Sequence, residues 1–170
     1  PKGGSLQWGI IKDGQNKVLG IISNGGIEKN RISFSQFNIC WFKGVQFGVE
    51  IEIRMKAVSG KVDQGGGPIW RVFDSDNYYV ARANPLEGNF RVYYVRNGKR
   101  VQIASTDVDT DSDKWYTIKI VHRGDKIEGY LNGRKYIEVK SDMLPNEGGI
   151  GVWTKADALS YFDDIKVTIK

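Results

Sequence analysis

The stretch that decides the fold class is KWYTIKIVHRGDKIEGYLNGRKYIEV, residues 114–139. Residues 115–121 alternate in large part between apolar and polar side chains, which is the pattern of a β-strand with one buried face. Residues 123–125, Arg-Gly-Asp, predict a turn. Asn132-Gly133 predicts a second turn, because Asn-Gly accepts the two positive φ angles of a type I′ hairpin. The stretch therefore predicts three antiparallel strands in a row.

The same pattern extends through most of the chain. Asn97-Gly98 lies between the apolar-rich runs 91–95 and 101–104, which predicts another hairpin, and residues 161–169 also alternate in large part. Residues 65–68, Gly-Gly-Gly-Pro, predict a loop before a strand that starts at Ile69. No helical periodicity is found over three turns, so the 170 residues predict a single all-β domain, residues 1–170, built as an antiparallel sandwich or barrel.

Composition and charge exclude several classes of protein. No apolar run approaches the roughly 20 residues that a membrane helix needs, so membrane insertion is not expected. A single cysteine, Cys40, and a single histidine, His122, exclude a disulfide framework, a multi-cysteine zinc site and a histidine metal centre. The formal net charge of +5 favours anionic partners such as acidic polysaccharides, but the basic residues form no block of the kind that binds nucleic acid. The oligomeric state is left open.

Three segments resemble a known family. They are GGGPIWRVFDSDNYYVARANPLEGNFRVYYV at 65–95, the stretch 114–139, and GGIGVWTKADALSYFDDIKV at 148–167. The chain resembles bacterial concanavalin A-like, or laminin-G-like, jelly-roll domains related to the 3-keto-disaccharide hydrolase domain and to carbohydrate-binding modules. The resemblance implies a jelly-roll sandwich of two curved antiparallel sheets with a concave face that commonly holds sugar. It also implies a secreted or periplasmic location.

Alternation places a set of polar side chains on one sheet face. Arg82 and Asn84 share a face opposite Ala81 and Ala83, and Trp153, Lys155 and Asp157 likewise share a face. Paired donors, a carboxylate and an aromatic ring together are what a sugar requires. We therefore expect an open, hydrophilic glycan-binding cleft lined by Arg71, Arg82, Asn84, Trp153, Lys155 and Asp157, with Tyr79 and Tyr93 as additional contacts. The alternative is an internal Arg82–Asp157 ion pair with Trp153 in the core.

Other acidic residues have simpler interpretations. Asp74 and Asp76 are candidate ligands of a structural Ca²⁺ ion, but their spacing favours a hairpin turn, since Asp bonds its own backbone. Glu50 and Glu52 partly match the paired acids of family-16 glucanases, but Arg54 stands where a further carboxylate is needed. They are interpreted as a polar outer face, His122 is expected at a strand edge or turn, and no residue is predicted to be catalytic.

The sequence leaves three functions open. The leading hypothesis is a non-catalytic module that binds an oligosaccharide or polysaccharide, with acidic glycans permitted by the charge. The second is a glycoside hydrolase or lyase of the 3-keto-disaccharide hydrolase type, for which the available acids are Asp157, Glu50, Glu52 and Asp74. The third is a structural or protein-interaction domain of a cell-surface protein.

Overall fold

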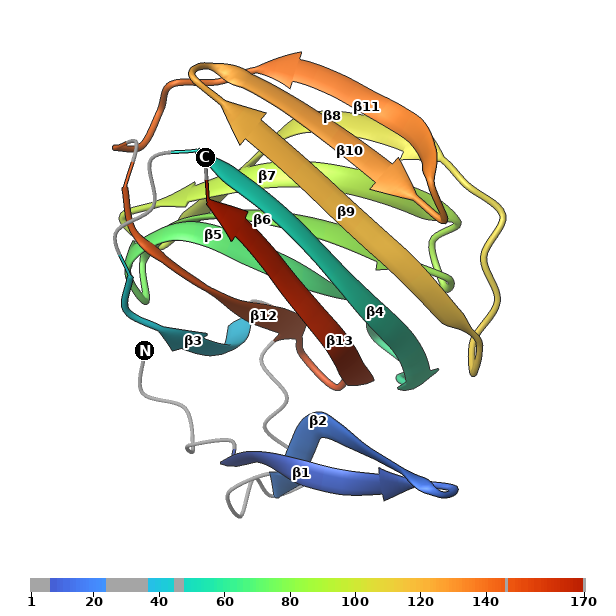
Figure 1. The fold of residues 1–170 in the computed structure, drawn as a ribbon. Coiled ribbons are helices and arrows are strands. Elements are labelled where there is room, and N and C mark those ends of the chain that lie inside the picture. Colours follow the sequence, from blue (N-terminus) through green and yellow to red (C-terminus); the bar gives the residue numbers. More distant parts are fainter. Residues whose placement is uncertain (1–6, 24–36, 45–47, 146, 170) are drawn as a thin grey trace.

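The computed structural model describes residues 7–23, 37–44, 48–145 and 147–169, which form two antiparallel β-sheets packed face to face (Figure 1). The predicted all-β sandwich is confirmed. None of the described residues belongs to a helix of membrane-spanning length and hydrophobicity.

The first sheet has seven strands and contains the stretch that decided the fold class. Its spatial order is β1 (Gln7–Asp13), β2 (Asn16–Ser23), β13 (Leu159–Ile169), β4 (Val49–Ser59), β9 (Trp115–Arg123), β10 (Lys126–Leu131) and β11 (Arg134–Lys140). The three predicted strands are therefore β9, β10 and β11, each hydrogen-bonded to the next. Asn132 and Gly133 have φ angles of 49° and 80°, both positive, as a type I′ turn requires.

The second sheet has six strands. Its order is β3 (Phe37–Phe42), β12 (Gly149–Lys155), β5 (Gly66–Asp74), β6 (Asn77–Asn84), β7 (Asn89–Arg96) and β8 (Lys99–Asp107). The prediction of a loop over residues 65–68 is wrong, because β5 already begins at Gly66. A Cβ atom on Gly67 would lie 2.1 Å from the carbonyl oxygen of Ala81, so glycine is needed there for the close approach of β6.

The main core lies between the two sheets. Alternate residues of β4 and β9, such as Ile51 and Ile120, face Trp70, Tyr79 and Phe90 of the six-stranded sheet, and all are fully buried. Each such side chain contributes about 1.5–3 kcal/mol of burial free energy. Alternate side chains of the six-stranded sheet point into this core. The side chains between them must therefore point to the opposite face of the sheet.

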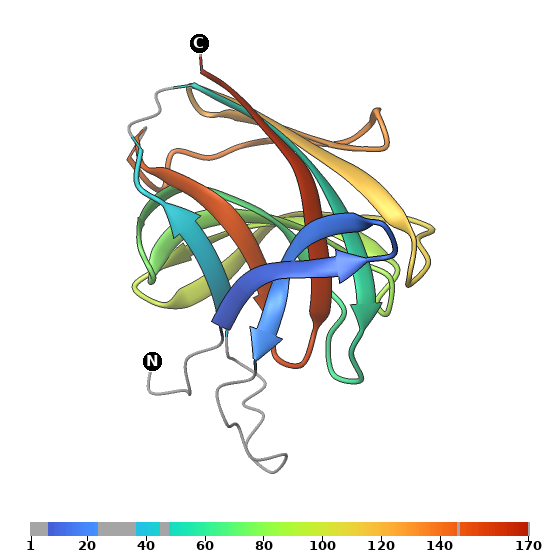
Figure 2. The same ribbon diagram turned by 60° about the horizontal axis from the view of Figure 1, so that its bottom comes forward.

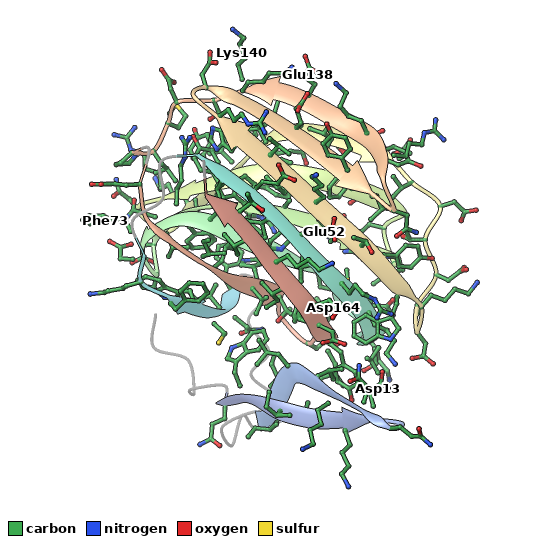
Figure 3. All side chains as sticks on the ribbon, in the orientation of Figure 1. Asp13, Glu52, Phe73, Glu138, Lys140 and Asp164 are labelled. Carbon is green, nitrogen blue, oxygen red and sulfur yellow. The ribbon has the colours of Figure 1, made fainter. Side chains whose placement is uncertain are left out.

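The β1–β2 hairpin extends the seven-stranded sheet beyond β13. In Figure 2 the hairpin crosses the end of β13, and the register between β2 and β13 holds a single pair, Leu19 with Phe162. The tip of the hairpin carries Asp13, labelled in Figure 3 near the lower end of β4. Its carboxylate accepts hydrogen bonds of 2.7 and 2.8 Å from Nζ of Lys56 in β4. This contact joins the hairpin tip to the body of the sheet.

Candidate functional site

The side of the six-stranded sheet that faces away from the main core is called the outer face here. It carries a second apolar cluster, formed by Ile69, Val72, Tyr78, Val80, Tyr93, Val95 and Trp153. Antiparallel sheets commonly leave one face in water, whereas both faces of this sheet are buried over its central strands β5 and β6. The outer face is therefore less open than the sequence predicted, and Trp153 has no exposed surface.

Arg82 lies at the centre of this face on β6, with 1% of its surface exposed. Its Nε and Nη2 atoms donate to the hydroxyl of Tyr93 at 3.3 and 3.2 Å, and Nη2 donates to Glu87 at 2.8 Å. Burial acts to lower the pKa of Arg82, but Tyr93, Glu87 and Asp63 raise it, with a net increase. The guanidinium therefore stays charged inside the cluster.

Asp63 connects Arg82 to neighbouring polar side chains. Its carboxylate is buried and lies 3.8 Å from Nη1 of Arg82 and 3.6 Å from Nζ of Lys155. It also accepts a hydrogen bond of 3.2 Å from Asn84 and one of 2.6 Å from the backbone N–H of Gly65. Such pairing offsets the cost of burying two opposite charges, a cost that would otherwise be several kcal/mol for each ion.

Arg100 contributes a second guanidinium to the same face. Its Cζ atom lies 4.4 Å from the ring centre of Tyr93, 5.3 Å from that of Phe37 and 5.5 Å from that of Trp153. Burial lowers the pKa of Arg100. The side chain is partly exposed and forms no ion pair within the described part of the chain. Three aromatic rings thus hold a cation at the solvent-facing edge of the cluster.

These contacts define the Arg82–Arg100 cluster. Its members are Phe37, Asp63, Arg82, Asn84, Glu87, Tyr93, Arg100, Trp153 and Lys155. Five of the eight predicted ligand-binding residues belong to it, namely Arg82, Asn84, Tyr93, Trp153 and Lys155. The other four, Phe37, Asp63, Glu87 and Arg100, were not predicted from the sequence. A two-residue turn at Asn97-Gly98 pairs Arg100 with Val95, so the register of that hairpin could have placed Arg100 on the outer face.

Arg71 and Tyr79 do not join this cluster, and their expected grouping with Arg82 is corrected. Tyr79 faces the main core, where it stacks on Trp70 at 5.6 Å, because it alternates with Tyr78 on β6. Arg71 has a φ of 48° in an irregular part of the β5–β6 pairing, which breaks the alternation. Its Nη2 atom donates to the carbonyl oxygen of Gly124 at 3.1 Å, across the sandwich.

Asp157 also departs from the prediction. Strand β12 ends at Lys155 and Ala156 has a φ of 52°, so the expected alternation stops before Asp157. Its carboxylate accepts backbone hydrogen bonds from residues 61, 62 and 63 at 2.8, 3.1 and 3.1 Å. Burial acts to raise the pKa of Asp157, but these bonds lower it, with a net decrease. Asp157 therefore holds the loop that carries Asp63.

The alternative prediction, an internal Arg82–Asp157 ion pair with Trp153 in the core, agrees with the structure only in part. Arg82 does form an internal ion pair, but with Asp63 and Glu87 and not with Asp157. Trp153 is buried, but on the outer face and not in the core between the sheets. The predicted sharing of a face by Arg82 and Asn84 is confirmed, since both contact Asp63 while Ala81 and Ala83 lie in the main core.

The candidate calcium ligands form a hairpin turn. The Oδ1 atom of Asp74 accepts hydrogen bonds of 2.8 Å from the backbone N–H of Asp76 and from the side chain of Asn77. This is the turn that the sequence favoured. Within the described ranges, no three His, Cys, Asp or Glu side chains gather in a way that could hold a metal ion.

Glu50 and Glu52 lie on the outside of the seven-stranded sheet, and Figure 3 labels Glu52 there. Glu50 pairs with Lys119, and Glu52 lies 3.4 Å from Nζ of Lys166. The prediction that these acids lie on a polar, solvent-facing side of their own sheet is confirmed.

His122 lies in the main core, and the prediction of a strand edge or turn is wrong. It has no exposed surface, and its Nδ1 atom accepts a hydrogen bond of 2.9 Å from Nε1 of Trp70. Burial and the nearby charge of Arg71 lower the pKa of His122 to about 3. The ring is therefore neutral and serves the packing of Trp70 and Tyr79.

The comparisons with known proteins agree with this architecture. A family profile described as "3-keto-alpha-glucoside-1,2-lyase-like domain" matches residues 22–168. No curated protein matches the chain significantly in sequence.

Solved structures show the same fold at low sequence identity. Carbohydrate binding module CBM66 from Bacillus subtilis superposes with a TM-score of 0.72 at 19% identity, covering 98% of this chain and 96% of that one. A Bacillus subtilis protein of unknown function with a galectin-like fold gives 0.63 at 11% identity, covering 95% and 86%. Sheep galectin-11 gives 0.55 at 8% identity, covering 81% and 100%. The predicted concanavalin A-like jelly roll is thereby confirmed.

Proposed function

The chain belongs to the 3-keto-α-glucoside-1,2-lyase-like domain family, and from this membership and the geometry of the outer face we propose that it is a carbohydrate-binding domain. The similarity in fold to carbohydrate binding module CBM66 and to a galectin supports the proposal. From the family membership we also propose a secreted or periplasmic location.

One observation carries the proposal, namely two guanidinium groups with unused donors beside aromatic rings on one sheet face. The Nη1 atoms of Arg82 and Arg100 are buried and donate no hydrogen bond to the protein within the described residues. Buried donors in native proteins are almost always paired. Nη1 of Arg82 has Asp63 at 3.8 Å, whereas the partly exposed Arg100 has no such neighbour in the described part of the chain, so its guanidinium needs a partner from outside the chain. Water or the hydroxyl groups of a sugar can supply it.

The exposed members of the cluster are proposed to contact the glycan, and the buried members to hold them in position. Phe37, Arg100 and Lys155 are partly exposed, so a glycan meets them first. Phe37 offers apolar surface to a sugar, and the two cations offer donors for its hydroxyl groups. Arg82 and Asn84 lie behind them and fix Tyr93 and Asp63 in place.

A second candidate function follows from the name of the family. A 1,2-elimination on a 3-keto-glucoside needs a base that removes the proton at C2, next to the carbonyl group. Glu87 is the most exposed carboxylate of the cluster, and although burial acts to raise its pKa, Arg82, Asn89 and Arg91 lower it overall. An acid held ionised by two arginines is a weak base, which favours binding over elimination.

A glycan array of the full chain, followed by a turnover assay on every ligand found, tests both functions. The proposal expects binding without product, and binding that falls when Arg100 is changed to Gln. Arg134→Gln is the matched control, because Arg134 also covers an aromatic ring, that of Tyr136 at 4.9 Å, but on the seven-stranded sheet. Turnover that is lost in Glu87→Gln supports the elimination. An array with no ligand overturns the proposal and favours a structural or protein-interaction domain.

A further inference from the structure

The positive charges of the Arg82–Arg100 cluster outnumber its negative charges. Asp63 and Glu87 are its two carboxylates, and both are already engaged by cations. Asp63 contacts Arg82 and Lys155, while Glu87 contacts Arg82 and the neighbouring Arg91. No carboxylate in the described residues lies within ion-pair distance of Arg100. The cluster therefore holds a cation without a counter-ion.

The two guanidinium groups lie close to the same ring. The Cζ atoms of Arg82 and Arg100 are 5.8 and 4.4 Å from the ring centre of Tyr93. The two like charges repel each other: burial is the main cause that lowers the pKa of Arg100, and the charge of Arg82 lowers it further. A negative group bound beside Tyr93 would relieve this repulsion.

The unused donors are of the kind that bind an anion. Neither Nη1 atom has a hydrogen-bond partner among the residues that the structure describes, but Nη1 of Arg82 lies 3.8 Å from Asp63, so Arg100 is the guanidinium that lacks a carboxylate. Its side chain is partly exposed. Guanidinium groups bind carboxylates with paired, charge-assisted hydrogen bonds that are roughly twice as strong as neutral ones. A neutral sugar hydroxyl would satisfy these donors without balancing the charge.

We propose that the outer face binds an acidic glycan, with the carboxylate of a uronic acid residue held by the partly exposed guanidinium of Arg100 beside Tyr93. This inference rests on the proposed carbohydrate-binding function and names its ligand class. The formal net charge of +5 adds a long-range attraction to a polyanionic chain. Lys155, with 20% of its side chain exposed and its ammonium group 3.6 Å from Asp63, adds a further positive charge to the cluster.

Isothermal titration calorimetry of the full chain tests the inference. The probes are short oligosaccharides of galacturonate, glucuronate and mannuronate, each as the free acid and as its neutral methyl ester, together with neutral hexose oligosaccharides. At least one free acid should bind about tenfold or more tightly than its ester, since the ester loses the charge-assisted bonds. Its affinity should also fall as salt is added.

Two variants test whether the preference for the acid over its ester depends on Arg100. Arg100→Gln should weaken binding of the acid by about tenfold and leave that of the ester within about twofold, whereas Arg134→Gln should change neither. If Arg100→Gln fails to fold, the comparison of acid and ester in the unaltered chain decides alone. Equal affinity for acid and ester, or binding of neutral glycans only, overturns the acidic ligand and leaves the proposed function intact. No binding of any glycan overturns both.

Discussion

Asp157 shows at the residue scale how one carboxylate positions a binding face without lying on it. Three consecutive backbone N–H groups, those of residues 61–63, point at its two oxygens. The third of these residues is Asp63, whose buried carboxylate pairs with Arg82 and Lys155. The placement of the central ion pair therefore depends on a residue outside the cluster.

Asp157→Ala should lower the free energy of unfolding by about 1–3 kcal/mol, because it leaves buried or half-buried backbone donors unpaired. Asp157→Asn should have an intermediate effect, since it keeps one acceptor oxygen. Urea denaturation measures both. Asp125→Ala is the control, because the side chain of Asp125 pairs with Lys140 at the surface and has only a minor influence on His122. An unchanged midpoint for Asp157→Ala would show that the loop is held by other contacts.

At the scale of elements, the end of β9 carries a buried neutral histidine. His122 faces Trp70 and Tyr79 from the main core, with Arg71 and the less influential Asp125 as its charged neighbours. Its pKa in the folded chain, about 3, lies below the ordinary value of 6.5. As the pH falls, the unfolded chain takes up this proton first, so protonation favours unfolding.

The contribution of His122 to the free energy of unfolding should therefore be fully present above pH 6.5 and decline as the pH falls towards 3. The slope of this decline should approach about 1.4 kcal/mol per pH unit. His122→Gln keeps an acceptor for Trp70 and removes the titration. Urea midpoints between pH 7 and pH 5 should fall less in the variant than in the unaltered chain. Parallel curves would contradict a buried, neutral His122.

The β1–β2 hairpin offers a second test at this scale. Lys56 bonds Asp13 and lies 5.4 and 5.5 Å from the rings of Trp115 and Tyr161. Lys56→Met should therefore speed amide hydrogen exchange in β1 and β2 more than in β9 and β10. A double-mutant cycle with Asp13→Ala should give a coupling of about 1 kcal/mol. Unchanged exchange in the hairpin would show that Lys56 does not hold it.

Local patterns predicted the elements well and the site only in part. The Asn-Gly turns fix the hairpins at 97–98 and 132–133, since both central residues take positive φ there. Alternation placed Arg82 and Asn84 correctly on β6. It failed at Arg71 and Asp157, because a positive φ at Arg71 and at Ala156 breaks the period of two. Asp63 and Phe37 could not be found by alternation, since they reach the cluster from a distant loop and from β3.

On the scale of the whole molecule, the six-stranded sheet is shared by two apolar layers. One lies between the sheets and the other covers the outer face. Neither layer can form without this sheet, so we propose that the chain unfolds as one domain. Far-UV circular dichroism and tryptophan fluorescence should report the same urea midpoint. Two separated transitions would contradict a single domain.

The most direct test of the central claim is an NMR titration of the ¹⁵N-labelled chain with a glycan found on the array. The account predicts that side-chain N–H signals of Arg82, Arg100 and Trp153 shift in a saturable way. The indole signal of Trp115, which lies beneath Arg54 on the seven-stranded sheet, should stay in place and serve as the internal control. Saturable shifts at Trp115 with none at Arg100 would contradict a carbohydrate site on the outer face.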